Sequence, residues 1–241
     1  MDAAHARRSP ATSQAVSLTP SGYFWRLQAR WVFKSSARGA RVLWRFARAE
    51  AQSELELRLA AQLSSTPEKA LFLRHALDEA RHARRFLELA RELSRDTSAD
   101  GMARPHVDSE ELIERLGPTR FIAFVHFGER RGRLQFEAYA HALSKSHPRL
   151  AEAFARTARE EREHERYTRA LLLEHAGEQG TARALRWVQA WEAWRRFRRA
   201  GRAFAHVSYA LLMSIVYLCA WPLARWFARS RPALRGFISQ R

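Results

Sequence analysis

Four stretches of the chain carry apolar residues at steps of three and four, the spacing that gathers side chains on one face of an α-helix. They are residues 41–63, 71–93, 120–143 and 150–175. Each predicted helix needs a partner for its apolar face, because leaving that face in water costs free energy. The pattern therefore predicts an all-α protein in which four helices, within residues 41–177, bury these faces in a common core.

Acidic and histidine side chains occupy the middle of every apolar face. A buried carboxylate without a partner costs several kcal/mol, so a compensating group must lie nearby. These inward residues are Glu50 in the first stretch, Glu79 and His82 in the second, Glu129 in the third, and Glu161 and His164 in the fourth.

The two halves of the predicted bundle carry the same arrangement. In each half, a helix with one inward Glu precedes a helix with an E-x-x-H segment. Glu129 follows Glu50 by 79 positions, and Glu161 follows Glu79 by 82. Two E-x-x-H segments alone are unremarkable in a chain rich in Glu and His. Their place on matching apolar faces predicts two helical hairpins that fold around one centre.

This constellation resembles the ligand set of the ferritin-like di-iron carboxylate superfamily, whose bundles take one Glu from each of two helices and E-x-x-H from each of the others. The resemblance covers residues 40–177 and leaves the subfamily open. It implies a ferritin-like four-helix bundle with a long crossover and two bound iron ions, with manganese as the alternative. The matching residues are Glu50, Glu79-Ala80-Arg81-His82, Glu129 and Glu161-Arg162-Glu163-His164.

The residue types suit this chemistry. Residues three positions apart lie about 5–6 Å apart on one helix face, so one E-x-x-H can offer a carboxylate and an imidazole to the same metal pair. Four ionised Glu balance the charge of two divalent ions, and the gain of charge on oxidation favours chemistry with O2. Carboxylate and imidazole ligands suit iron or manganese. Asp78 and Glu160 precede the two motifs, and we expect each to accept the N–H of the opposite hairpin's histidine.

Several neighbouring residues leave alternatives open. Glu54 shares a helix face with Glu50 and is its rival as a ligand. His75 and His126 lie one turn before Glu79 and Glu129, where we interpret them as packing or pocket residues that could also support the ligands. Gly128 and Gly132 flank Glu129. Glycine inside a helix costs about 1 kcal/mol relative to alanine, so these two indicate either a channel for O2 or substrate, or close helix packing.

The segments outside the bundle differ from it in composition. Residues 1–21 read as a disordered tail, and residues 95–107 as the long crossover between the hairpins. Residues 22–40 alternate basic and aromatic side chains, as an amphipathic helix at an anionic membrane surface does; a solvated basic face is the alternative. Residues 181–229 form a long basic and hydrophobic helix, and residues 230–241 a basic tail.

The distribution of charged and apolar residues indicates contact with a membrane. The net charge is +17, and Cys219 is the only cysteine, which excludes an intramolecular disulfide. Residues 203–224 contain no charged side chain and are long enough to cross a hydrocarbon core of about 30 Å. Arginines on either side predict a protein at the cytoplasmic face of the bacterial inner membrane or another membrane, peripheral or single-span. If this helix packs on the bundle, the protein is cytoplasmic.

Three functions fit these features. The leading hypothesis is a membrane-associated di-iron oxidase or oxygenase, with membrane lipids and O2 as partners and a lipidic or quinone-like substrate. The alternative is a ferroxidase or a rubrerythrin-like protein that handles iron or peroxide; it shares every ligand. Nucleic-acid binding would explain the positive charge, but that charge borders apolar segments and no recognised nucleic-acid motif is present. The sequence identifies neither the electron donor nor the oligomeric state.

Overall fold

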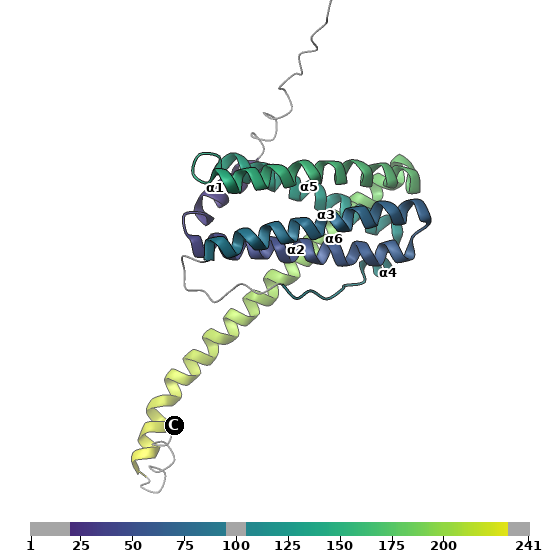
Figure 1. Ribbon diagram of the computed structural model, residues 1–241. Helices are drawn as coiled ribbons and strands as arrows, with labels where there is room; N and C mark the ends of the chain where they lie inside the picture. The colour runs from purple at the N-terminus through teal and green to yellow at the C-terminus, as the bar shows by residue number, and fades with distance from the viewer. Residues whose placement is uncertain (1–19, 95–104, 231–241) are drawn as a thin grey trace, which may run out of the picture. The chain divides into compact units, whose positions relative to one another are not determined.

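The structure is a computed structural model that describes residues 20–94 and 105–230. These residues form six α-helices, and no strand occurs among them (Figure 1). The predicted all-α bundle is therefore confirmed. The helices are α1 (Pro20–Val32), α2 (Ser36–Leu63), α3 (Thr66–Ser94), α4 (Leu112–Leu116), α5 (Pro118–Leu143) and α6 (Pro148–Ser230).

Some helix boundaries differ from those expected. Pro20 begins α1, so residues 20 and 21 are helical although the sequence placed them in a disordered tail. A break at residues 33–35 separates α1 from α2, and α2 starts at Ser36, five residues before the predicted bundle helix. Residues 1–19 of the tail, 95–104 of the crossover and 231–241 of the basic tail lie outside the described residues.

The bundle is built from α2, α3, α5 and the first part of α6. Helices α2 and α3 pack side by side, and α1 packs against α5 (Figure 1). Aromatic rings from all four bundle helices meet in the core, with centroids of contacting rings 5.2–6.0 Å apart, in the range of favourable aromatic pairs. We call this group the aromatic core: Phe46, Phe86, Phe136, Tyr139 and Phe154.

Gly177 interrupts α6 at the end of the bundle. Its φ of 60° lies in the left-handed region, which an L-residue adopts only at a cost. Beyond this residue the chain turns back, and the Thr181 hydroxyl donates a hydrogen bond of 3.0 Å to the carbonyl of Leu172. The guanidinium of Arg120 lies over the Trp187 ring at 4.5 Å, which ties the turned segment to α5.

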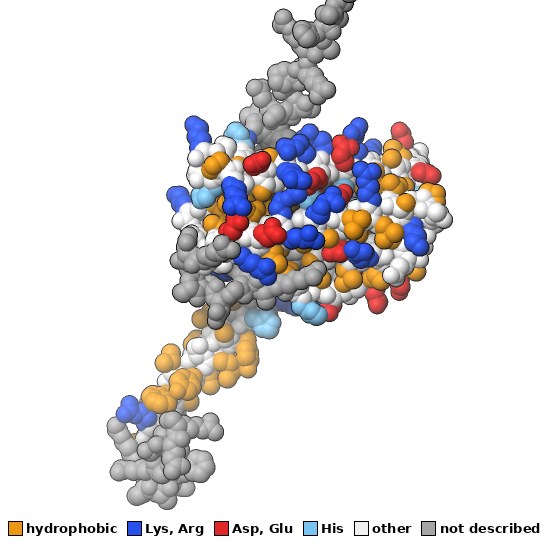
Figure 2. All heavy atoms as spheres, in the orientation of Figure 1, with side chains coloured by type: hydrophobic (Ala, Val, Ile, Leu, Met, Phe, Trp, Pro, Cys, Tyr) orange, Lys and Arg blue, Asp and Glu red, His pale blue; other side chains and the backbone are white. Residues whose placement is uncertain are grey.

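Residues 189–230 form a separate compact unit, the last part of α6. Every residue from 201 to 227 is exposed, including Leu212 and Tyr217, and the visible face of the helix is largely apolar (Figure 2). Among the described residues, this is the one helix long and apolar enough to cross a membrane by its length and composition.

Candidate metal centre

Carboxylates and imidazoles from all four bundle helices converge on one place in the core. The structure brings the six predicted ligands together in two overlapping groups, and within each group the potential ligand atoms lie within 4.8 Å of one another. Glu79 belongs to both groups, as a carboxylate that bridges two ions would. The first group is Glu50, Glu79, His82 and Glu161; the second is His75, Glu79, Glu129 and His164.

Apolar layers enclose this cluster along the bundle axis. On one side lies the aromatic core, since Phe86 is one turn after His82 on α3. On the other side the rings of Phe72 and Phe121 pack edge to face at 6.0 Å. Glu79 is 1% exposed and His82 fully buried. Most polar groups of the cluster are thus shielded from water along the bundle axis and must satisfy one another or hold ions.

Each E-x-x-H histidine is held by an acid from the other hairpin. Nε2 of His82 lies 2.8 Å from Oε2 of Glu160, and Nε2 of His164 lies 3.1 Å from Oδ2 of Asp78. Because the carboxylates accept, both rings carry their proton on Nε2 and turn Nδ1 toward the cluster. The predicted positions of Asp78 and Glu160 match this arrangement, which fixes the tautomer of a metal-ligating histidine.

The two inward nitrogens fit a metal pair. Nδ1 of His82 and Nδ1 of His164 are buried and make no hydrogen bond within the described part of the chain. The former lies 3.2 Å from Oε1 of Glu161, and the latter 3.5 Å from Oε1 of Glu79. As neutral imidazoles, these two side chains present nitrogen lone pairs beside carboxylates, the donor set that a divalent iron or manganese ion binds.

The electrostatics of the cluster favour bound positive charge. Burial, followed by repulsion from Glu161, raises the pKa of Glu79 well above its usual value, and the same two causes raise the pKa of Glu129 to about 7. Burial lowers the pKa of His82, but its contacts with Glu160 and Glu161 outweigh burial and raise the pKa to about 9. Without metal, protons must therefore supply the positive charge that the carboxylates need.

His75 lies in the second donor group, beyond the packing or pocket role predicted from the sequence. Its Nε2 lies 3.1 Å from Oε1 of Glu79 and 3.5 Å from Oε1 of Glu129, and its Nδ1 lies 2.5 Å from the Tyr167 hydroxyl. The side chain is 1% exposed. Its place on the apolar face, one turn before Glu79, was the available signal. That signal could not separate a packing residue from a donor because both face the core.

The structure also shows where the other residues with alternative predicted roles lie. Glu54 lies outside both donor groups and pairs with Arg58 at 2.9 Å, so Glu50 is the α2 residue in the centre. His126 stays outside the two groups, with Nδ1 3.1 Å from the carbonyl of Glu165. Close packing does not explain the glycines: a Cβ at Gly128 would meet nothing within 4 Å, and one at Gly132 only a Phe136 carbon at 3.8 Å. The channel hypothesis for these glycines stays a prediction.

A pocket of about 460 Å³ reaches the centre between α3 and α6. His75, His164 and Tyr167 line its inner part. Charged side chains and two leucines make up most of the remaining wall, so the pocket offers both polar and apolar contacts to a small molecule. The other lining residues are Leu71, Arg74, Leu77, Asp78, Arg81, Glu160 and Glu163.

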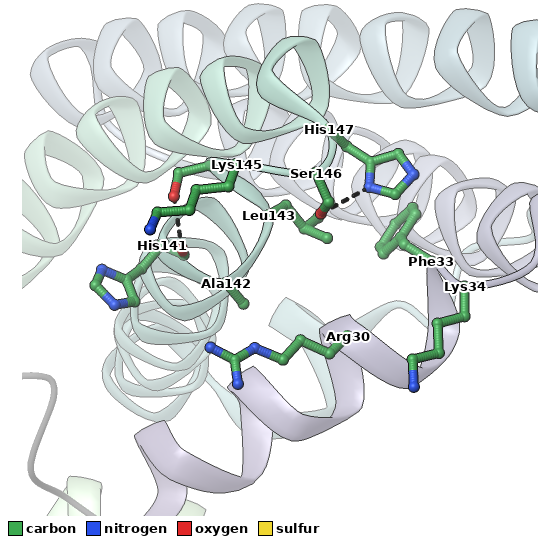
Figure 3. A pocket seen from close by; sticks show the side chains of 10 residues that line it. Arg30, Phe33, Lys34, His141, Ala142, Leu143, Lys145, Ser146 and His147 are labelled. Atoms are coloured by element: carbon green, nitrogen blue, oxygen red, sulfur yellow. Dashed lines mark hydrogen bonds between the residues drawn. The ribbon is translucent and has the colours of Figure 1, made fainter.

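A second pocket, of about 680 Å³, lies away from the centre, between α1 and the turn from α5 to α6. Arg30 of α1 and Lys34, in the break that follows α1, face Lys145 and two histidines across it (Figure 3). None of its lining residues is acidic. The surface here is therefore electropositive and could receive an anionic group.

Comparison with known proteins gives one match. Residues 121–195 match the family model described as Rubrerythrin. This range contains most of α5 and the first part of α6, and with them Glu129, Glu161 and His164. No curated protein and no solved structure matches the chain. The match thus falls on the hairpin that supplies half of the cluster.

Proposed function

We propose that this ferritin-like chain is a di-iron oxidoreductase whose metal pair reduces a small oxidant, hydrogen peroxide or O2. One observation carries the proposal: six Glu and His donors from two matching hairpins converge in the bundle core, and the inward nitrogens of His82 and His164 make no hydrogen bond within the described residues. The rubrerythrin match over residues 121–195 supports a redox role, since such domains are typically redox-active. Manganese suits the same donors.

Each of the two donor groups would hold one metal ion. Glu50 and His82 would hold one ion, Glu129 and His164 the other, and Glu79 reaches both groups. When bound, two Fe(II) ions supply two electrons that, with two protons, reduce one hydrogen peroxide to two waters, after which an external donor restores Fe(II).

The chain's own residues orient the ligands and admit the oxidant. Asp78 and Glu160 keep the two imidazoles turned inward through their hydrogen bonds. Burial raises the pKa of Tyr167 well above its usual value, so this phenol keeps its proton and can donate a hydrogen bond in the inner pocket. The charged side chains of the pocket wall offer hydrogen-bond partners to hydrogen peroxide, which an acyl chain could not use.

A second candidate is a membrane-tethered di-iron oxygenase with a lipidic or quinone-like substrate. The exposed apolar helix formed by residues 203–224 favours it, because that length suits a membrane span. The exposed aromatic residues Phe24 and Trp31 of α1 add a surface that suits a bilayer interface. Arginines that precede the span agree with a bundle on the cytoplasmic side.

The proposal is tested with the full chain in detergent, loaded anaerobically with Fe(II). We expect two irons per chain and consumption of one hydrogen peroxide for every two Fe(II) oxidised, as followed by an iron(III) absorbance. Peroxide consumption no faster than that of the same Fe(II) in buffer would exclude the peroxidase reaction.

The two candidates differ in their products. An oxygenase incorporates oxygen from O2 into an organic molecule, so mass spectrometry of the lipid extract after turnover under labelled O2 separates them. An unlabelled extract with label recovered only in water favours the reduction of a small oxidant. Labelled lipid or quinone favours the second candidate.

A further inference from the structure

The two halves of the centre differ at two pairs of equivalent positions. Four residues before Glu79 stands His75, whereas four residues before Glu161 stands Thr157. Three residues after His164 stands Tyr167, whereas Arg85 takes the equivalent place after His82.

Each of these unlike pairs makes its own contact between α3 and α6. The Tyr167 hydroxyl lies 2.5 Å from Nδ1 of His75, and Nη1 of Arg85 donates a 2.7 Å hydrogen bond to the Thr157 hydroxyl. Arg85 also lies 3.0 Å from Oε2 of Glu160, outside the donor groups. Equivalent positions of the two halves are thus in contact in both cases, but the side chains differ. Only the half with His75 has an additional imidazole at the centre.

His75 has the position of a ligand rather than that of a packing residue. Its Nε2 lies between two carboxylates, 3.1 Å from Glu79 and 3.5 Å from Glu129. Its ring centroid lies 3.7 Å from that of His164, at an angle of 35°. Together these four residues present donor atoms within 4.8 Å of one another. Packing alone would be served by an apolar side chain, which would not bring a nitrogen lone pair to two acids.

We propose that His75 is a seventh metal ligand, which binds through Nε2 to the ion held by Glu129 and His164. The inference rests on the proposed metal pair and adds a difference between its two positions. A neutral imidazole that binds metal through Nε2 carries its proton on Nδ1, and the Tyr167 oxygen accepts that N–H. One position then has two imidazoles and the other has one.

This asymmetry predicts an order of binding. Divalent ions such as Co(II) gain from an additional imidazole, so the position with His75 fills first. The ion at that position is also the one that lies at the pocket, because His75 and His164 line the pocket wall whereas His82 does not. The oxidant therefore meets the ion that is richer in nitrogen ligands.

Titration of the full chain in detergent with Co(II) under anaerobic conditions tests the binding role. We expect His75→Gln to weaken one of the two Co(II) binding events by at least about tenfold, since even residues that only orient a ligand contribute that much. Glutamine can still donate a hydrogen bond to Glu79, so a merely positioning role would leave the affinity unchanged. In His75→Ala, added imidazole entering by the pocket should restore binding. The matched control, Thr157→Val, changes the equivalent position in the other half and should keep both affinities.

The wild-type protein alone gives a second readout that does not depend on any variant. In the proton NMR spectrum of the Co(II) form, each ligated imidazole contributes one strongly shifted exchangeable N–H signal. Three such signals support the seventh ligand. Two signals, or His75→Gln affinities equal to those of the wild type, overturn it while leaving the metal pair intact. Fewer than one Co(II) bound per wild-type chain overturns the metal pair itself, and the inference with it.

Discussion

Nε2 of His82 on α3 lies 2.8 Å from the carboxylate of Glu160 on α6, which belongs to the other hairpin. The reciprocal contact joins His164 to Asp78 at 3.1 Å. Each hairpin thus orients the histidine of its partner, and neither half can form its metal position alone. Formation of either metal position therefore requires both hairpins to pack in one bundle.

Removal of one orienting acid should weaken metal binding without abolishing the fold. We expect Asp78→Asn and Glu160→Gln each to lower Fe(II) or Mn(II) affinity by about 10–100-fold, as such substitutions do at other metal sites. Calorimetric titration measures this change. Glu163→Gln is the control, because Glu163 is exposed and pairs with Arg166 at 3.0 Å. An affinity unchanged in Asp78→Asn would contradict the orienting role.

The choice between Glu50 and Glu54 can be tested by the matched pair of substitutions. Glu50→Gln should reduce the bound metal from two ions to about one per chain, since it removes a charged ligand from one donor group. Glu54→Gln should keep two ions, because Glu54 only pairs with Arg58. Elemental analysis after gel filtration gives both numbers. The reverse result would place the α2 ligand at Glu54.

Helical periodicity was enough to predict the bundle and six of the seven residues in the two donor groups. Glu50, Glu79 and Glu161 stand at positions whose neighbours are apolar, so their inward direction follows from the spacing. The repeat of the pattern in two halves then implied that they meet. Local sequence thus sufficed wherever the direction of a side chain is set by its own helix.

Features that depend on contacts between helices escaped the sequence analysis. The part played by His75 depends on distances to Glu129 and Tyr167 on other helices. Likewise, the turn at Gly177 could not be predicted from local sequence, because the segment after it is held by the contact of Trp187 with Arg120 on α5. The start of α1 at Pro20 lay in a stretch whose composition resembles a tail, and packing against α5 outweighed that local tendency.

The metal-free protein should lose stability as the pH rises from 6.5 to 9. Glu129 and His82, with folded pKa values of about 7 and about 9, hold protons more tightly in the folded chain than at their ordinary values of 4.5 and 6.5. Their contribution is complete below those ordinary values and is lost as the pH rises through the folded values. Bound metal replaces the protons and should remove this loss. Thermal denaturation with and without Mn(II) measures it; parallel curves would count against the account.

The left-handed turn at Gly177 should not tolerate a side chain. We expect Gly177→Ala to destabilise the bundle by about 1–3 kcal/mol, because φ 60° with ψ −176° is a conformation that essentially only glycine adopts. Gly201→Ala serves as the control, because Gly201 is helical and a Cβ there would meet nothing within 4 Å. Denaturant unfolding followed by circular dichroism compares them. Equal stability of the two variants would show that the turn at residue 177 can relax.

Membrane attachment through residues 203–224 can be tested by charge. Lysine at the centre of a span costs about 2.5–3.5 kcal/mol, so the double variant Leu212→Lys, Val216→Lys should move the protein from the membrane fraction into the supernatant after an alkaline wash. Leu63→Lys, at an exposed site at the end of α2, should leave the distribution unchanged. Wild-type protein found entirely in the supernatant would exclude the span.

The most direct test of the central claim is the metal content of the purified full chain after anaerobic loading with Fe(II) and removal of unbound iron. Six donors that converge from two hairpins predict two irons per chain, lost together in Glu79→Gln because Glu79 belongs to both donor groups. Fewer than one transition-metal ion per wild-type chain would contradict the account.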